Sequence, residues 1–178
     1  MTSDAIKVEV ITDLADAPGW AEMMREYLHF AAARHREATG EIVDPDAHMK
    51  LTTEKIDHYL DQDGRFIVAR HPKGGLAGMI LLQRLANGKG EVKRLYVAPT
   101  ARRMGIASML LARLESEARA MGCSALYLDT TTGLPEAIAF YRGLGFVDAV
   151  FDPESVQDPA IVAHLVFMEK PLADIKQK

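Results

Sequence analysis

Residues 91–107, EVKRLYVAPTARRMGIA, have the types and spacing of a phosphate-binding element. The pattern is typical of a β-strand that turns through a basic, glycine-containing loop into an amphipathic helix. The first N–H groups of a helix lack partners within the helix, and the helix dipole adds positive potential there, so anions bind. Gly105 lets a ligand approach the backbone, and Arg102 and Arg103 supply guanidinium groups suited to phosphate. The chemistry implied is the binding of phosphate oxygens.

Taken alone, this segment could equally be an ordinary turn with two solvated arginines. A second strand over residues 126–130 and a helix from Pro135 follow it, however, and Ala137, Tyr141, Gly145 and Phe146 form the pattern Ala-x-x-x-Tyr-x-x-x-Gly-Phe. Strand, Arg-x-x-Gly-x-Ala, helix, strand and this second pattern, in that order, resemble the GCN5-related N-acetyltransferase (GNAT) family. The resemblance covers residues 91–147.

The resemblance implies an α/β fold in which the whole chain, residues 1–178, forms one GNAT-like domain. The family's fold is a mixed, twisted sheet of about seven strands flanked by about four helices. Its fourth and fifth strands run parallel but splay apart, and acyl-CoA lies between them. In this chain these strands would be residues 91–98 and 124–130.

The resemblance also assigns the cofactor contacts, with acetyl-CoA as co-substrate. Backbone groups on the fourth strand would hold the pantetheine arm and donate a hydrogen bond to the thioester oxygen, while amides at the start of the next helix would hold the pyrophosphate. Where the family often has an asparagine, this chain has Leu134, so that contact is absent or made by Thr131 or Thr132. The expected cofactor-binding residues are Leu95, Tyr96, Val97, Arg102, Arg103, Met104, Gly105, Ile106, Ala107, Ser108, Thr132, Leu134 and Tyr141.

The reaction that the resemblance implies is direct acetyl transfer to an amine while both substrates are bound. An alkyl amine with a pKa of about 10.4 is neutral only roughly once in 2,500 molecules near pH 7, so a base must help. Glu91 and Asp129 are the two candidate bases, and for each the alternative is a structural or solvated carboxylate. Tyr141 would give a proton or a hydrogen bond to the departing thiolate, unless its ring only packs against its helix.

Two alternatives stay open at this point. The chain could bind acyl-CoA without catalysis, as a sensor or regulatory module. The loop could also be a general nucleotide cradle, although the chain lacks both Gly-x-x-x-x-Gly-Lys-Ser/Thr and a Gly-x-Gly-x-x-Gly after a strand.

Composition limits the other classes. The 178 residues are 48% hydrophobic with a net charge of −4, which suits one globular core and argues against a nucleic-acid binder. The lone Cys123 cannot form an internal disulfide, and no Cys and His spacing suggests a metal site. No apolar run approaches membrane-spanning length, and a reducing cytoplasm is the expected location. As acceptor we expect a small-molecule amine or an amino acid rather than a protein. Apolar residues on the last strands allow a homodimer.

Hydrophobic periodicity predicts the elements that position these residues. The helix after Gly105 carries an apolar stripe of Ile106, Met109, Leu110, Leu114 and Ala118. Polar residues of the first two helices, among them His29, His35 and His48, either recognise the acceptor or form a solvated face. Elsewhere we expect strands at 6–10, 65–70, 76–84, 146–151 and 160–170, helices at 20–38, 46–60 and 135–143, a hairpin turn at 87–88 and a loop at 152–159.

Overall fold

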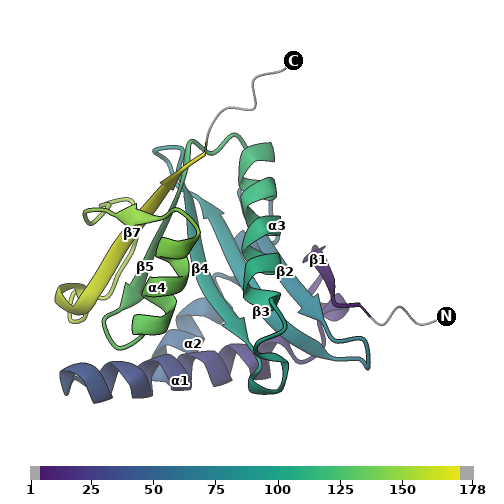
Figure 1. Cartoon of the computed structure of the whole chain (residues 1–178), viewed down its shortest axis with the longest axis horizontal. Coiled ribbons are helices and arrows are strands. Elements are labelled where there is room, and N and C mark those ends of the chain that lie inside the picture. The colour runs from purple at the N-terminus through teal and green to yellow at the C-terminus, as the bar shows by residue number, and fades with distance from the viewer. Residues whose placement is uncertain (1–4, 173–178) are drawn as a thin grey trace.

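The computed structural model describes residues 5–172, and a seven-stranded mixed sheet forms its centre (Figure 1). The strand order is β1-β2-β3-β4-β5-β7-β6; β4 and β5 are parallel, and every other neighbouring pair is antiparallel. The strands are β1 (Lys7–Ile11), β2 (Gly64–Arg70), β3 (Leu76–Arg84), β4 (Gly90–Val97), β5 (Ala125–Thr131), β6 (Val147–Asp148) and β7 (Leu165–Pro171). The expected mixed sheet with one parallel pair is confirmed.

Helices cover both faces of this sheet. They are α1 (Trp20–Thr39), α2 (Pro45–Glu54), α3 (Ile106–Ala120) and α4 (Pro135–Gly143). In Figure 1, α3 and α4 lie in front of the sheet, and α1 and α2 lie behind and below it. Alternate residues of β2 enter opposite cores, because Ile67 packs with α3 whereas Phe66 and Val68 pack with α1. Both faces of the central strands are therefore largely buried, and most of their residues are apolar.

The hairpin that joins β3 to β4 sets up the most important irregularity of the sheet. Gly88 takes a φ of 84° in the turn, as the Asn-Gly pattern predicts. Along the ladder, Leu81 faces Lys93 while Met79 faces Tyr96, so β4 carries one extra residue there. Arg94, inside this bulge, has a φ of 57°. Bulges of this kind bend a strand and increase its twist.

The bulge coincides with the point where β4 parts from β5. The two strands pair only from Gly90 with Leu126 to Val92 with Leu128. Beyond that point β4 continues to Val97 and β5 to Thr131 without pairing with each other, while β5 stays paired with β7 over its whole length. The expected splayed pair is thus present, and the bulge explains its position.

The prediction of one helix over residues 46–60 is wrong for residues 55–60. α2 ends at Glu54, and a short 3₁₀ helix, η2 (Ile56–Tyr59), follows. Thr52 and Thr53 turn their hydroxyls back onto the carbonyls of His48 and Met49, a bonding pattern that weakens and bends helices. The tighter 3₁₀ turn also directs Ile56 and Tyr59 into the core beneath α1.

The last two strands are shorter than the sequence predicts. The strand expected at 146–151 is reduced to the two residues of β6, and the strand expected at 160–170 begins only at Leu165, after a 3₁₀ turn at Val162–His164. Side-chain contacts pull residues 149–161 off the sheet: Asp152 bonds to Asn87 and Ser155 bonds to Glu91. The loop thereby reaches β4.

In α3, Met109 is 39% exposed and does not belong to the apolar stripe, whereas Leu111 is buried.

Asp152 anchors this loop from a nearly buried position. Its carboxylate accepts hydrogen bonds from Asn87 Nδ2 at 2.9 Å and from the Glu154 amide at 3.0 Å, and lies 3.1 Å from Lys89 Nζ. Burial raises the pKa of Asp152, but these donors lower it more, so the pKa lies below its ordinary value of 3.8. Stability from this group is therefore present above pH 3.8 and is lost as the pH falls through the folded-state pKa.

We predict that Asp152→Asn lowers Tm by about 3–8 °C near pH 7, because Lys89 loses its buried partner. The loss of Tm between about pH 5 and pH 2 should also be shallower than in the wild type. Differential scanning calorimetry across this range measures both effects. Asp148→Asn is the matched control, since Asp148 forms an exposed pair with Arg142. An unchanged Tm with an unchanged pH slope would contradict the anchoring role.

Candidate functional site

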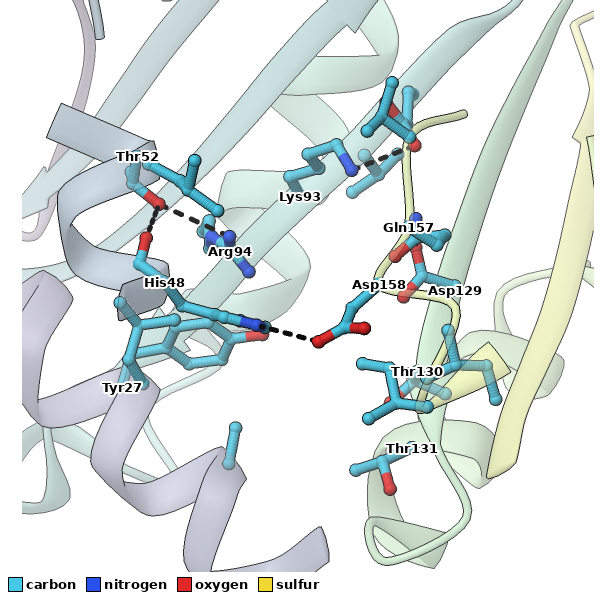
Figure 2. Close-up of a pocket in the computed structure, with 18 of the residues that line it drawn as sticks. Tyr27, His48, Thr52, Lys93, Arg94, Asp129, Thr130, Thr131, Gln157 and Asp158 are labelled. Atoms are coloured by element: carbon cyan, nitrogen blue, oxygen red, sulfur yellow. Dashed lines mark hydrogen bonds and ion pairs between the residues drawn. The ribbon is translucent and has the colours of Figure 1, made fainter. Parts of the chain in front are cut away.

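A cavity of about 630 Å³ lies where β4 and β5 part. Its walls come from α1, α2, β4, β5, α4 and the loop before β7 (Figure 2). Polar side chains from most of these elements converge on it. They include His35, His48, Thr52, Glu91, Lys93, Arg94, Asp129, Thr131, Tyr141, Glu154, Gln157 and Asp158. The cavity therefore combines apolar enclosure with several groups able to bind or move protons.

Glu91, one of the two carboxylates expected as a base, lies on β4 and lines this cavity with 2% of its surface exposed. It is fully engaged by neighbours. Lys93 Nζ lies 3.0 Å away, and the Ser155 hydroxyl donates a hydrogen bond to the same carboxylate. Loss of one partner from a buried ion pair destabilises a protein strongly. The surroundings of Glu91 are therefore those of a structural carboxylate.

Asp129, the other candidate base, lies near the end of β5 and is only half-buried. Its carboxylate accepts a hydrogen bond of 2.6 Å from Gln157 Nε2, a neutral amide. No cation lies within ion-pair distance of Asp129 among residues 5–172. Asp129 can therefore accept a proton without breaking an ion pair. The structure brings both carboxylates to the same cavity, from opposite strands of the opening.

Tyr141 lies on α4, which begins at Pro135, and its ring reaches the cavity through the apolar core. The ring packs edge-on against Phe140 and Phe146, each at 5.5 Å between centroids. Burial, and to a lesser extent the neighbouring Tyr27 and Asp129, raise the pKa of Tyr141 well above its ordinary value. The phenol therefore keeps its proton across the physiological range and can act as a hydrogen-bond donor.

The predicted contacts on β4 divide between the faces of the strand. Leu95 lines the cavity, whereas the Tyr96 ring turns the other way and packs against Tyr27 and Phe30, at 5.8 and 6.3 Å between centroids. Val97 packs with the core under α3. Because both of these side chains are packed elsewhere, Tyr96 and Val97 can offer a ligand in the opening only their backbone groups.

The basic loop leads directly into α3. Arg103 has a φ of 63° and Gly105 a φ of 73°, and Gly105 is the N-cap residue of the helix. Such left-handed residues turn successive N–H groups toward one point, the geometry of an anion-binding nest. A Cβ added to Gly105 would meet nothing within 4 Å, so the space beside it is open. The side chains of Arg102, Arg103, Met104 and Ser108 are exposed, Ala107 is half-buried and Ile106 is buried.

This loop lies outside the residues that line the cavity. The Arg102 guanidinium leans back over the Phe30 ring, 5.4 Å from its centroid, and so covers part of α1. The amides at the start of α3 and the cavity are thus two separate features.

Leu134 is buried at the N-cap of α4 and lines the cavity without a capping hydrogen bond from its side chain. Of the two threonines considered as substitutes for an amide there, Thr131 is already engaged: its hydroxyl lies 2.8 Å from His35 Nδ1 and accepts from the Gly133 amide. Thr132 is exposed and does not line the cavity. His35, which could belong to a solvated face by sequence, is instead buried at 3% exposure.

The structure adds contacts that the sequence did not reveal. His48 on α2, which the sequence left open between acceptor recognition and a solvated face, lies 3.9 Å from Asp158 across the cavity (Figure 2). Burial first, and the Arg94 charge second, lower the pKa of His48 below its ordinary value. Arg94 and Gln157 also face the cavity. No local pattern could reveal these contacts, because they join segments separated by up to 110 residues, from His48 to Asp158.

Comparison with known proteins bears on the same segments. The family model described as the acetyltransferase (GNAT) family matches residues 21–146. An IAA acetyltransferase from Azospirillum brasilense is 44% identical over 129 residues, which are 68% of this chain and 81% of that protein. A streptothricin acetyltransferase from Streptomyces lavendulae is 32% identical over 113 residues, covering 62% of this chain and 60% of that protein.

Solved structures share the fold. A GNAT-family acetyltransferase from Staphylococcus aureus Mu50 has a TM-score of 0.72 at 20% identity, covering 95% of this chain and 100% of that one. A PaiA N-acetyltransferase from Thermoplasma acidophilum, in complex with coenzyme A, has a TM-score of 0.70 at 21% identity, covering 94% and 99%. Within residues 5–172 there is no helix able to span a membrane and no cluster of three potential metal ligands.

The different surroundings of the two carboxylates generate a prediction. Glu91→Gln should lower the free energy of unfolding by about 3 kcal/mol, because Lys93, only 17% exposed, loses its charged partner. Asp129→Asn should cost less than about 1 kcal/mol, because Gln157 can reorient its amide. Urea unfolding followed by circular dichroism measures both. Equal destabilisation by the two variants would show that the burial of Glu91 does not decide its role.

Proposed function

Because this chain belongs to the GNAT acetyltransferase family, we propose that it transfers the acetyl group of acetyl-CoA directly to an amine, with both substrates bound together. We favour a small molecule or an amino acid as acceptor over a protein. The observation that carries the proposal is the opening between β4 and β5, which holds two carboxylates and a buried tyrosine. The whole of residues 1–178 would serve this one function as a single domain.

Acetyl-CoA would enter between the parted strands. The amides from Arg103 through Ser108 would bind its pyrophosphate, supported by the two left-handed residues and the open space beside Gly105. Backbone groups of Leu95 and Val97 would pair with the pantetheine arm, in place of the missing bonds to β5. The Thermoplasma relative of the same fold was solved with coenzyme A, which supports the choice of cofactor.

We assign the role of base to Asp129, acting directly or through a water molecule. Deprotonating an alkyl ammonium near pH 7 costs about 4.6 kcal/mol, and a nearby carboxylate lowers that barrier. Asp129 is half-buried and bonded only to a neutral amide, so it can take the proton freely. Glu91 would instead fix Lys93 and the Ser155 loop, because its carboxylate is committed to both.

Attack by the neutral amine on the thioester carbon would form a tetrahedral intermediate. A backbone N–H near Leu95 or Tyr96 would stabilise its oxyanion, since the strand edge there lacks a partner. The carbon–sulfur bond then breaks, and Tyr141 would donate a hydrogen bond or its proton to the thiolate. Burial raises the pKa of the Tyr141 phenol. Full proton transfer from Tyr141 to the CoA thiolate is therefore energetically feasible only where the thiolate is desolvated to the same extent.

An acceptor screen that measures CoA release tests the proposal most directly. We expect acetyl-CoA to raise Tm more than ATP or NAD does, and at least one small amine to release CoA above the rate of hydrolysis. A rise of Tm with acetyl-CoA but no transfer to any amine would favour the non-catalytic sensor. Stabilisation by ATP alone would return the loop to a general nucleotide cradle.

Tyr141→Phe should lower kcat about 100-fold while changing the Kd for acetyl-CoA less than about threefold, because the lost hydroxyl acts on the leaving group. Steady-state kinetics and calorimetric titration with acetyl-CoA separate these quantities. Phe140→Leu, a change in the adjacent ring, controls for packing on α4. Equal losses in kcat and in acetyl-CoA affinity would exclude the leaving-group role.

Two further expectations stay predictions. A homodimer could form through Val147, Val150 and Phe151, which are 61%, 84% and 42% exposed near β6. A cytoplasmic location is consistent with the lone, buried Cys123, whose pKa burial raises.

A further inference from the structure

The bulge in β4 turns Arg94 into the cavity. Side chains of β4 otherwise alternate between faces: Val92 and Leu95, which also border the cavity, pack with the core under α3, whereas Glu91 and Lys93 lie on the other face. Regular alternation would place Arg94 on the face of Val92. With its φ of 57°, Arg94 instead lies on the face of Lys93 and lines the cavity, and Leu95 resumes the pattern.

The left-handed conformation of Arg94 is energetically unfavourable. Steric contact between the Cβ and the backbone disfavours this conformation in every residue but glycine, and residues that adopt it gather at functional sites. Glycine would adopt the same φ without that cost. The presence of arginine here, rather than glycine, points to a use for its side chain.

The guanidinium of Arg94 has unused capacity. Its Nη2 donates to Thr52 Oγ1 at 3.3 Å, and the Thr52 hydroxyl donates onward to the His48 carbonyl at 2.9 Å. The guanidinium also lies 6.0 Å from the centroid of the Tyr27 ring. Among residues 5–172, no carboxylate lies within 4.0 Å of it, whereas the neighbouring Lys93 is paired with Glu91 at 3.0 Å. The guanidinium makes no other hydrogen bond among residues 5–172, so four of its five N–H donors have no protein partner.

The opposite side of the cavity is acidic. Figure 2 shows Arg94 beside Thr52 and His48 on one side, with Asp129 and Asp158 across from it. Glu154 lines the same cavity. A ligand with a negative group toward Arg94 and a positive group toward Asp129 would match both sides.

From this geometry we propose that the acceptor carries a carboxylate in addition to its amine, and that Arg94 binds that carboxylate. The inference rests on the proposed function and narrows its substrate class to amino acids. The planar guanidinium can donate hydrogen bonds to both carboxylate oxygens at once, while Thr52 and the Tyr27 ring hold it in place. The ammonium of the same molecule then lies toward Asp129, the proposed base.

A carboxylate fits this site better than a phosphate. A phosphate group carries up to two negative charges near pH 7, and a lone guanidinium facing Asp129 and Asp158 cannot balance both. A neutral amine would leave the donors of the half-buried Arg94 without a ligand partner, which lowers affinity.

The test compares α-amino acids and ω-amino acids with their carboxamides, and includes O-phosphoethanolamine as the phosphate arm. Both CoA release and the shift of Tm are measured for the wild type, Arg94→Gln and Arg94→Lys. Arg25→Gln, an exposed change of the same kind on α1, is the matched control. Circular dichroism establishes that each variant is folded, and the Kd for acetyl-CoA reports on the cofactor half of the site.

We expect the wild type to prefer at least one amino acid over its carboxamide by about 10- to 100-fold in kcat/KM. Arg94→Gln should lose this preference at an unchanged Kd for acetyl-CoA, Arg94→Lys should keep part of it, and Arg25→Gln all of it. A preference for carboxamides or phosphoethanolamine, a preference that survives in Arg94→Gln, or the absence of any carboxylate effect would overturn the inference.

The Tm measurement keeps this inference separate from the proposed function. If no amine releases CoA, yet amino acids raise Tm in the wild type and not in Arg94→Gln, the result supports the carboxylate-binding site and excludes the proposed transfer reaction. If CoA is released from neutral amines alone, the transfer reaction stands and the carboxylate site fails.

Discussion

The partial pairing of β4 with β5 is the constraint on which the rest of the site depends. Three residue pairs hold the strands together, and a bulge at Arg94 then turns β4 away. Backbone N–H and C=O groups rarely stay unpaired inside proteins, so the open edge of β4 needs water or a ligand. A cofactor arm with amide groups would complete the edge as a strand does. The cavity, the exposed start of α3 and the position of Tyr141 all follow from this one opening.

The loop between β6 and β7 converts the opening into an enclosed site. Asp152 ties it to the β3–β4 turn through Asn87 and Lys89, and Ser155 ties it to Glu91 in the strand itself. Buried polar groups joined in this way are costly to separate. Glu91 therefore has the contacts of a structural carboxylate, whereas the half-buried Asp129 has no ion-pair partner among residues 5–172.

Charge is distributed across the cavity in a way that gives it direction. Arg94 on β4 faces Asp129 and Asp158 on the other wall, and His48 lies on the same side as Arg94, its pKa lowered by burial and by Arg94. A zwitterionic acceptor would bind in one orientation only, with its amine toward the thioester. Positioning of this kind raises the rate without any new chemical group. The same bulge would thus open the cofactor groove and orient the acceptor.

Local patterns in the sequence predicted the strand, loop and helix around Gly105 and the Asn87-Gly88 hairpin, because each depends on neighbouring residues. The parallel strand pair was expected only from the resemblance to the GNAT family. They failed where distant contacts decide the outcome. The Thr52 and Thr53 hydroxyls and the core beneath α1 end a helix that periodicity extends to residue 60, and the contacts of Asp152 and Ser155 shorten the last strands. The left-handed Arg94 has no local signature, since arginine does not favour that conformation. The burial of His35 against Thr131 was likewise invisible.

Amide-resolved hydrogen exchange, with and without CoA, tests whether the unpaired edge of β4 binds the cofactor. The account predicts that CoA slows exchange at amides of residues 95–97 and 103–108, and leaves the edge strand β1 unchanged. CoA-dependent protection confined to other parts of the chain, or no protection on β4 at saturating CoA, would contradict it.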